Sequence, residues 1–404
     1  MQIKKSTKLQ SVKYDIRGPV AEEAVRMRQA GIDIIQLNTG NPAAFGFAPP
    51  AQLPNILEEK QQLTAAYSDA KGLPYVREAI AAYEKSKGIP NVHVDHIFTG
   101  NGVSELITTC TMALLNPGDE ILIPMPDYPL WTAASRLAGG TVVHYTCDEA
   151  ASWFPDLADM RRKITPRTKA IVVISPNNPT GALYPREILQ GICEMAREHN
   201  LLIFSDEIYD RMLMDGNQHT AVASLAPDLC VITFNGLSKS HQLCGYRSGW
   251  MTISGDVSGA ADYLEGLTVL ASMRLCSNVP AQAIIPDAMQ NPNFSEAELL
   301  PGGRLYEQRQ QAFDGLQSIP GISVVKSMAG LYLFPKMDVA LGVKDDEQFA
   351  LDFLRQKYVL VTPGSGFNWP TPDHFRLVYL PEKEVLAEVI DRLRDFLATY
   401  RQGA

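Results

Sequence analysis

The sequence predicts an α/β protein whose larger domain contains a mostly parallel sheet between helices. The chain has 404 residues, more than one small hydrophobic core usually contains, so we expect a second, smaller domain. Between residues 141 and 250, apolar runs rich in Val, Ile and Leu alternate with stretches of helical periodicity, as in strands buried on both faces. After residue 300, short strands and helices are mixed, which predicts an α+β fold for the smaller domain.

The composition is that of a globular protein in water. Hydrophobic residues make up 46% of the chain and charged residues 20%, which argues against disorder. No apolar run approaches the length of a membrane span, and the basic start MQIKKSTKLQ lacks the apolar stretch of a secretory signal. These observations favour a cytoplasmic protein that does not contact a membrane.

Charge, cysteine spacing and histidine spacing argue against a nucleic-acid-binding surface, paired cysteines and a histidine metal site. The net charge of −9 disfavours a nucleic-acid-binding surface, which needs clustered positive charge. The six cysteines are widely spaced and form no CxxC pair, so we interpret them as reduced, structural thiols. His93 and His96 have no further Cys or His nearby, and we expect no metal site there.

Residues 1–40 predict an arm and a helix that join the smaller domain. The arm contains Tyr14 and Arg17 beside a Gly-Pro break, and AEEAVRMRQAG follows with helical signals. An arginine there is usually solvated or salt-bridged, but an arm that folds over a site could bring Arg17 to a substrate carboxylate. Gly40 follows the short strand IIQL in a tight loop, where backbone can approach a ligand closely.

Three positions between residues 60 and 130 could contact a ligand. Tyr67 precedes a Lys-Gly turn and either presents its phenol to a site or simply packs. The turn around Gly102 leads into a helix near Val103, whose free backbone N–H groups would suit a phosphate, although the turn lacks the full nucleotide-binding fingerprints. Tyr128, after the buried strand EILIPM, either stacks on an aromatic ligand or packs in the core.

Polar side chains follow three of the predicted parallel strands. Asn178 follows AIVVIS, Asp206 and Tyr209 follow LLIF, and Lys239 follows VITFN. Ligands of such sheets bind outside the carboxyl ends of the strands, so we expect these side chains to share one site. Glu207 beside Asp206 would allow a metal pair instead, but no histidine lies beside them in the sequence.

The segment TFNGLSKSHQLCGYRSGW contains the candidate nucleophile. A buried lysine can attack a carbonyl once its pKa is lowered, and Ser238 and Arg247 could bind a phosphate on a carbonyl cofactor attached to Lys239. The alternative is an ordinary surface lysine. Asp206 could pair with a protonated ring nitrogen of such a cofactor, and Tyr209 and Asn178 could bond a ring oxygen.

The C-terminal part begins after a connector rich in Pro, Gly and acidic residues, NPNFSEAELLPGGR. We therefore expect an arm and helix at residues 1–40, a large domain at 41–295 and a small domain at 296–404. Arg376 lies within the apolar strand HFRLVYL, where an unpaired charge would be unfavourable. A substrate carboxylate and an internal Asp or Glu are equally good partners for it.

Together these motifs resemble those of the class I/II aminotransferases. These enzymes depend on pyridoxal phosphate and have fold type I of the pyridoxal-phosphate-dependent enzymes. The resemblance covers nearly the whole chain and rests on Asn-Pro-Thr-Gly at residues 178–181, Asp206-x-x-Tyr209, Ser238-Lys239, Gly-x-Arg-x-Gly at 245–249 and Arg376. Segments such as YDIRGP, GNGVSELI, PDYPLWTAA and PGGRLYEQR resemble more narrowly the bacterial glutamate-pyruvate (alanine) aminotransferases.

The resemblance implies a seven-stranded, mostly parallel sheet, a homodimer with shared active sites, and a role for each site residue. It implies that Lys239 attaches the cofactor and moves a proton, that Asp206 pairs with the pyridine nitrogen, and that Tyr128 stacks on the ring. Asn178 and Tyr209 would bond the ring oxygen O3′. The phosphate would be bound by Gly102, Val103, Ser104, Ser238 and Arg247, and by Tyr67 of a second subunit. The amino-acid substrate would be contacted by Gly40, Asn178, Arg376, Tyr14 and Arg17. Residues 241–244 are less bulky and less basic than the resemblance implies.

The implied reaction is a ping-pong transfer of an amino group from L-glutamate to pyruvate. Arg17 would help to close the site and meet the distal carboxylate of glutamate. Three alternatives remain: transfer from other small or aromatic amino acids, a pyridoxal-phosphate β-lyase, and a cofactor-binding transcription regulator. The regulator would need a DNA-binding module and a basic surface, which this acidic chain does not suggest.

Overall fold

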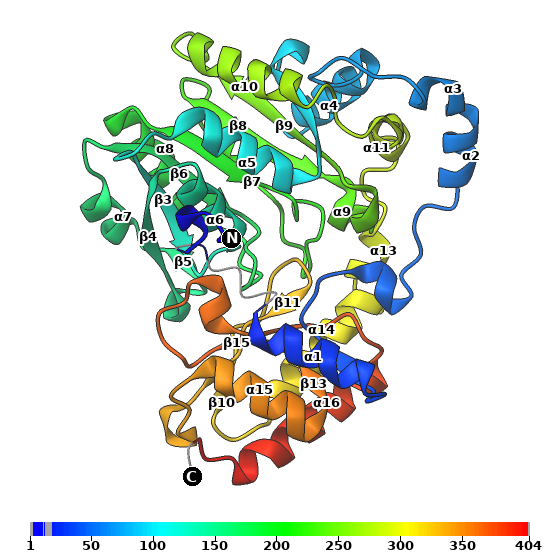
Figure 1. The fold of residues 1–404 in the computed structure, drawn as a ribbon, viewed down its shortest axis with the longest axis vertical. Coiled ribbons are helices and arrows are strands. Elements are labelled where there is room, and N and C mark those ends of the chain that lie inside the picture. Colours follow the sequence, from blue (N-terminus) through cyan, green and yellow to red (C-terminus); the bar gives the residue numbers. More distant parts are fainter. Residues whose placement is uncertain (1–2, 11, 13–17, 403–404) are drawn as a thin grey trace.

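The computed structural model describes residues 3–10, 12 and 18–402, and Figure 1 shows a large body with a central sheet above a smaller body that contains the C-terminal helices. Tyr14 and Arg17 lie outside the described residues. The helices are α1 (Pro19–Gln29), α2 (Leu53–Glu59), α3 (Gln61–Thr64), α4 (Pro74–Ser86), α5 (Val103–Leu114), α6 (Leu130–Leu137), α7 (Leu157–Lys163), α8 (Arg186–His199), α9 (Leu237–Ser240), α10 (Ala261–Met273), α11 (Val279–Ala283), α12 (Ile285–Ala288), α13 (Glu296–Leu299), α14 (Arg304–Gln317), α15 (Asp346–Lys357) and α16 (Lys383–Thr399).

The large sheet has eight strands in the order β2-β9-β8-β7-β6-β3-β4-β5. They are β2 (Ile97–Asn101), β3 (Glu120–Met125), β4 (Thr141–Asp148), β5 (Phe154–Pro155), β6 (Thr168–Ile174), β7 (Leu202–Asp206), β8 (Cys230–Gly236) and β9 (Ser248–Gly255). Strands β8, β7, β6, β3 and β4 pair in parallel, whereas β9 runs antiparallel to both of its neighbours. The predicted mostly parallel sheet is therefore confirmed, and the two-residue, antiparallel β5 adds an eighth strand to the expected seven.

Both faces of the sheet are covered by helices, which explains the continuous apolar runs of its strands. In β6, Val172 packs with α5, α6 and α10 on one face, and its neighbours Ile171 and Val173 pack with α4, α7 and α8 on the other. Successive side chains of a strand point to opposite faces, so a strand buried on both sides must be apolar at every position. This arrangement leaves the strand ends as the place for polar side chains.

The smaller body has its own core. Its strands are β1 (Ile35–Gln36), β10 (Ile322–Ser323), β11 (Tyr332–Leu333), β12 (Lys336–Met337), β13 (Val359–Leu360), β14 (Thr362–Pro363) and β15 (Phe375–Val378). Val20, Ala24 and Met27 of α1 pack with Phe349 and Phe353 of α15 in this core, so the N-terminal helix joins the C-terminal part of the chain. The boundaries at residues 40 and 295 stay a prediction, which the separate cores support.

Among the described residues, no helix combines the length and the apolar character that crossing a membrane requires. The six cysteines are free, and Cys110, Cys147 and Cys193 are buried. The prediction of unpaired thiols is therefore confirmed.

Candidate active site

A cavity of about 830 Å³ lies at the carboxyl ends of β6, β7 and β8, where the two bodies meet. Its walls come from segments far apart in the chain: the loop after β1, the start of α5, the ends of three parallel strands, and β11 and β15. The predicted site residues that line it are Gly40, Val103, Ser104, Tyr128, Asn178, Asp206, Tyr209, Ser238, Lys239, Arg247 and Arg376. Gly102 caps α5 directly behind this wall. Tyr67 is 81% exposed and is not among the lining residues.

Lys239 lies in the short helix α9 that follows β8, and its ammonium points into the cavity. The side chain is half-buried, so it is not an ordinary surface lysine. Its Nζ donates a hydrogen bond to the backbone oxygen of Gly40 at 2.7 Å, and the Cys244 Sγ lies 3.8 Å away. Within the described part of the chain, no ion pair joins Nζ to a carboxylate.

Asp206 ends β7 and is 3% exposed. Its Oδ2 accepts a hydrogen bond from the Trp131 indole at 3.1 Å. Burial raises the pKa of the Asp206 carboxyl to about 6, because the ionised form is poorly solvated there. A cationic group entering the cavity beside Asp206 would restore the charged carboxylate, which is what a protonated ring nitrogen can do.

Another part of the cavity wall is formed by Arg376, Asn178 and Tyr209. The Arg376 guanidinium donates to Asn178 Oδ1 at 3.0 Å and to the Asn38 backbone oxygen. The planar fork of an arginine is of the kind that binds a carboxylate through two hydrogen bonds. Tyr209 is buried, and its hydroxyl lies 2.9 Å from that of Tyr332.

The start of α5 and Arg247 form a cradle for an anion. A Cβ on Gly102 would lie 2.3 Å from Arg247 Nη2, and a Cβ on Gly249 would lie 2.7 Å from the Val103 nitrogen. Only glycines allow the guanidinium and the helix N-terminus to approach so closely. Arg247 Nη1 donates to the Cys244 backbone oxygen at 2.8 Å. Helix dipole, guanidinium and the Ser238 hydroxyl fit a phosphate-sized anion.

Residues 241–244, which depart from the resemblance, brace the lysine turn from behind. His241 is buried, stacks on Phe294, and lies with Nε2 3.1 Å from the Ala288 oxygen and 3.0 Å from the Asn291 oxygen. Gln242 donates to Glu298 at 2.6 Å. The segment therefore anchors the turn to residues 288–298, and His241 and Gln242 do not line the cavity.

Sequence reasoning missed Trp131 as the partner of Asp206, and Tyr332 and Asn38 as parts of the wall. Tyr332 lies in the apolar run GLYLF, which has the pattern of a plain core strand. The sequence pattern that could have indicated Asn38 is the tight loop at Gly40, two residues later, where a close approach to a ligand was expected.

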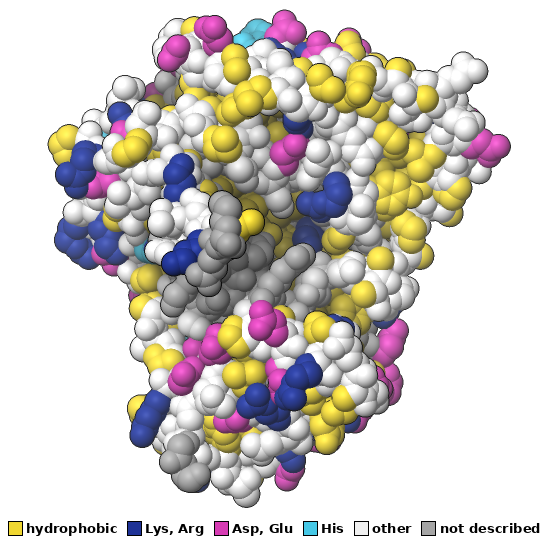
Figure 2. All heavy atoms as spheres, viewed as in Figure 1, with side chains coloured by type: hydrophobic (Ala, Val, Ile, Leu, Met, Phe, Trp, Pro, Cys, Tyr) yellow, Lys and Arg dark blue, Asp and Glu magenta, His cyan; other side chains and the backbone are white. Residues whose placement is uncertain are grey.

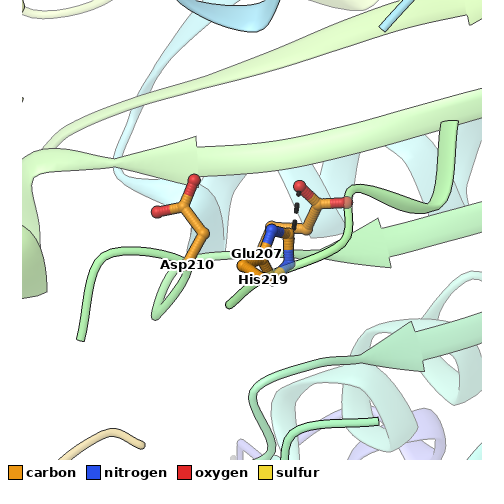
Figure 3. Close-up of side chains that lie close together, drawn as sticks. All are labelled: Glu207, Asp210 and His219. Carbon is orange, nitrogen blue, oxygen red and sulfur yellow. Dashed lines mark ion pairs between the residues drawn. The ribbon is translucent and has the colours of Figure 1, made fainter. Parts of the chain in front are cut away.

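A charge cluster lies just beyond the end of β7 (Figure 3). Glu207, Asp210 and His219 have potential ligand atoms within 4.8 Å of one another, and His219 Nε2 lies 3.9 Å from Glu207 Oε2. No histidine is near the acidic pair in the sequence, but the fold brings His219 beside Glu207. Lys87 already supplies a cation, with Nζ 2.9 Å from Glu207 and 3.3 Å from Asp210.

The chain is similar over its whole length to proteins of known class. The sequence model of the family "Aminotransferase class I and II" matches residues 32–393. A glutamate-pyruvate aminotransferase, AlaA, of Haemophilus influenzae is 53% identical, covering 98% of this chain and 99% of that protein. A crystal structure of an aminotransferase from Escherichia coli has a TM-score of 0.98 at 50% identity and covers 100% of both chains. An alanine aminotransferase from Pyrococcus furiosus has a TM-score of 0.93 at 38% identity, covering 98% of this chain and 100% of that one.

We expect Gly40→Ala to destabilise the protein, because the added Cβ would lie 2.2 Å from the Tyr332 hydroxyl. Overpacking of this kind lowers the unfolding free energy by about 1–3 kcal/mol. Gly245→Ala is the matched control in the same cavity wall, since its Cβ would meet nothing within 4 Å. Denaturant titration measures both variants, and equal stabilities would contradict the close approach of Gly40 to Tyr332.

We expect Lys87→Met to lower the unfolding free energy by about 3–5 kcal/mol, because buried carboxylates would lose their cation. Besides Glu207 and Asp210, Lys87 also pairs with Glu84, which is fully buried. Lys383→Met is the control: its pair with Glu307 is 3.8 Å long and exposed, so its loss changes stability by less than about 1 kcal/mol. Comparable losses in the two variants would show that the cluster does not depend on Lys87.

The contribution of Asp206 to the stability of the ligand-free protein should fall as pH rises from about 4 to about 6. The pKa of Asp206 is about 6 in the fold against 3.8 for an ordinary aspartate, so the folded state keeps a proton that the unfolded state has released. The difference corresponds to about 3 kcal/mol, fully expressed above pH 6. Asp206→Asn removes this contribution, so the wild-type-minus-variant stability should decline across this pH window. A flat difference curve would show that Asp206 titrates normally.

Proposed function

Because the chain belongs to the class I and II aminotransferases, we propose that it transfers an amino group from L-glutamate to pyruvate, giving 2-oxoglutarate and L-alanine. The observation that carries this proposal is that Lys239 faces a cavity that is also lined by the buried Asp206 and Arg376. The choice of substrates rests on the names of the full-length relatives, which act on glutamate and pyruvate or on alanine.

We propose pyridoxal phosphate as the cofactor. When bound, it supplies an electron sink that stabilises negative charge at the substrate α-carbon. Lys239 Nζ would hold the cofactor covalently and then, once released, carry the proton from the α-carbon. Among the described residues, Nζ contacts the Gly40 backbone oxygen and the Cys244 Sγ, so the amine can leave this position without breaking an ion pair to any of them.

The other cavity residues would orient the cofactor. Asp206 would pair with the ring nitrogen, Tyr128 would stack on the ring, and Asn178 and Tyr209 would bond the ring oxygen. The phosphate would lie in the cradle formed by Gly102, Val103, Ser104, Ser238 and Arg247. The raised pKa of Asp206 supports its assignment, because a cation there would make burial of the carboxylate favourable.

Arg376, Asn178 and Gly40 would bind the amino-acid substrate, with Arg376 gripping the α-carboxylate. Glutamate and alanine share this carboxylate, so one arginine can serve both halves of a ping-pong reaction. Tyr14 and Arg17 remain sequence-based candidates for contacts to the substrate, and the distal carboxylate of glutamate is the proposed partner of Arg17.

We propose a homodimer with shared active sites in the cytoplasm. Tyr67 supports the shared site, because its phenol is exposed and does not line the cavity of its own chain. Hydrophobic side chains also gather on the large body beside α2 and α11 in Figure 2. An exposed apolar patch of this kind suits a subunit interface.

Spectral titration of the cofactor-loaded protein tests the proposed reaction. We expect L-alanine and L-glutamate to bleach the visible band of the lysine-bound cofactor, and pyruvate to restore it. Lys239→Ala should reduce amino transfer on the order of 10³-fold, since it removes the proton carrier. Faster bleaching by aromatic amino acids would change the substrate assignment. Release of pyruvate from cystathionine without a keto-acid acceptor would instead favour a β-lyase.

A further inference from the structure

Tyr332 joins three functional parts of the cavity, although nothing in the sequence singled it out. It is 3% exposed and lies in β11, which pairs antiparallel with β15, the strand that carries Arg376. Its hydroxyl lies 2.9 Å from the Tyr209 hydroxyl. The Arg376 guanidinium carbon lies 4.4 Å from the centre of its ring. A Cβ on Gly40 would clash with it, so it also touches the loop that accepts the Lys239 hydrogen bond.

We propose that Tyr332 is a positioning residue. Its hydroxyl donates a hydrogen bond to the Tyr209 hydroxyl, so that the Tyr209 hydroxyl can donate a hydrogen bond to the bound cofactor. The inference rests on the proposed function and adds a second member to the hydrogen-bond chain at the ring oxygen. Tyr332 itself would not contact the cofactor. Its effect passes through the Tyr209 hydroxyl.

The direction of the bond follows from the single proton that each hydroxyl carries. If Tyr209 donated to Tyr332, it would have no proton left for an anionic ring oxygen. Burial holds the pKa of Tyr209 well above its usual range, so its hydroxyl remains protonated and can act as a donor. A hydroxyl that accepts one hydrogen bond also donates a stronger one. In a hydrogen-bond chain from Tyr332 through Tyr209 to the ligand, each hydroxyl proton therefore has an acceptor.

The ring of Tyr332 has a separate task. The guanidinium of Arg376 lies over Tyr332 on one side and 4.6 Å from the Phe367 ring centre on another. Two aromatic faces attract the cation and restrict its rotation, while its hydrogen bonds to Asn178 and Asn38 set its direction. A phenylalanine at position 332 would keep this packing and lose only the hydroxyl. This separation makes the hydroxyl testable by itself.

Several charged and titratable groups surround Tyr332. Tyr209 and Tyr379 interact with it electrostatically, and Arg376 lies over its ring. Asp206, Lys239 and Tyr128 line the same cavity. All of these groups are unchanged in a Tyr332→Phe variant, so a change in a measured pKa reports the missing hydroxyl.

The test is a pH titration of the visible absorbance of the cofactor-loaded protein, with Tyr332→Phe, Tyr209→Phe and the double variant. A hydrogen bond donated to the ring oxygen stabilises the deprotonated form of the bound cofactor, because the ring oxygen carries the most negative charge in that form. Tyr209→Phe should therefore raise the pKa of the absorbance change. Tyr332→Phe should raise it by a smaller amount, roughly half a pH unit. Adding Tyr332→Phe to Tyr209→Phe should cause no further shift.

Tyr145→Phe is the control for loss of a buried tyrosine hydroxyl. Tyr145 is fully buried, donates to the Val172 oxygen at 2.8 Å and is not among the cavity-lining residues. It should lower thermal stability as much as Tyr332→Phe does, with no change in the spectral pKa.

Two outcomes would overturn the inference. An unchanged spectral pKa in Tyr332→Phe would leave Tyr332 with a packing role alone, and an equal shift in the Tyr209→Phe background would show that it acts independently of Tyr209. A wild-type protein without a lysine-bound cofactor spectrum would overturn the proposed function, and this inference with it.

Discussion

The parallel register of β6, β7 and β8 is the constraint on which the site depends. Ile174, Asp206 and Phe234 lie level across these strands, so the chain leaves the sheet at one edge three times. Asn178 and Lys239 follow within a few residues of that level. The hydrogen-bond ladder and the apolar packing on both faces hold this register, because a slip of one residue would turn every buried side chain to the other face. Cavity geometry is therefore a consequence of core packing.

The small body completes the site through a few polar contacts. Strand β15 brings Arg376 to Asn178, and Asp127, next to Tyr128, accepts a hydrogen bond from Asn368 at 2.6 Å. Asp127 is fully buried, and burial raises its pKa to about 7. Each contact joins residues far apart in sequence, so the Arg376 side of the cavity forms only when both bodies are folded and in contact. Conformational entropy lost in bringing the bodies together is offset mainly by apolar burial around them.

Three buried acidic residues at the end of β7 illustrate how the same strand serves stability and chemistry. Glu207 and Asp210 face Lys87, which compensates their charge within the fold. Asp206 points to the cavity, where Trp131 supplies a neutral donor, and its raised pKa shows that its charge is not fully compensated. An incompletely compensated carboxylate favours a cationic ligand, whereas a compensated one holds the strand end in place. The division follows from the alternation of side chains along the chain at the end of β7.

The sequence by itself determined the sheet and most of the residues that line the cavity, because strand ends and glycine turns are local patterns. Lys239, Asp206, Asn178 and Arg247 could be found in this way, and all line one cavity. Only the tertiary structure decided the partners of these residues. Tyr332 meets Tyr209 across 123 positions of sequence, and His219 returns to Glu207 through a loop that carries no such pattern. Hydrogen bonds and ion pairs require atoms within a few ångströms of each other, and which distant segments come that close is set by the packing of the two bodies.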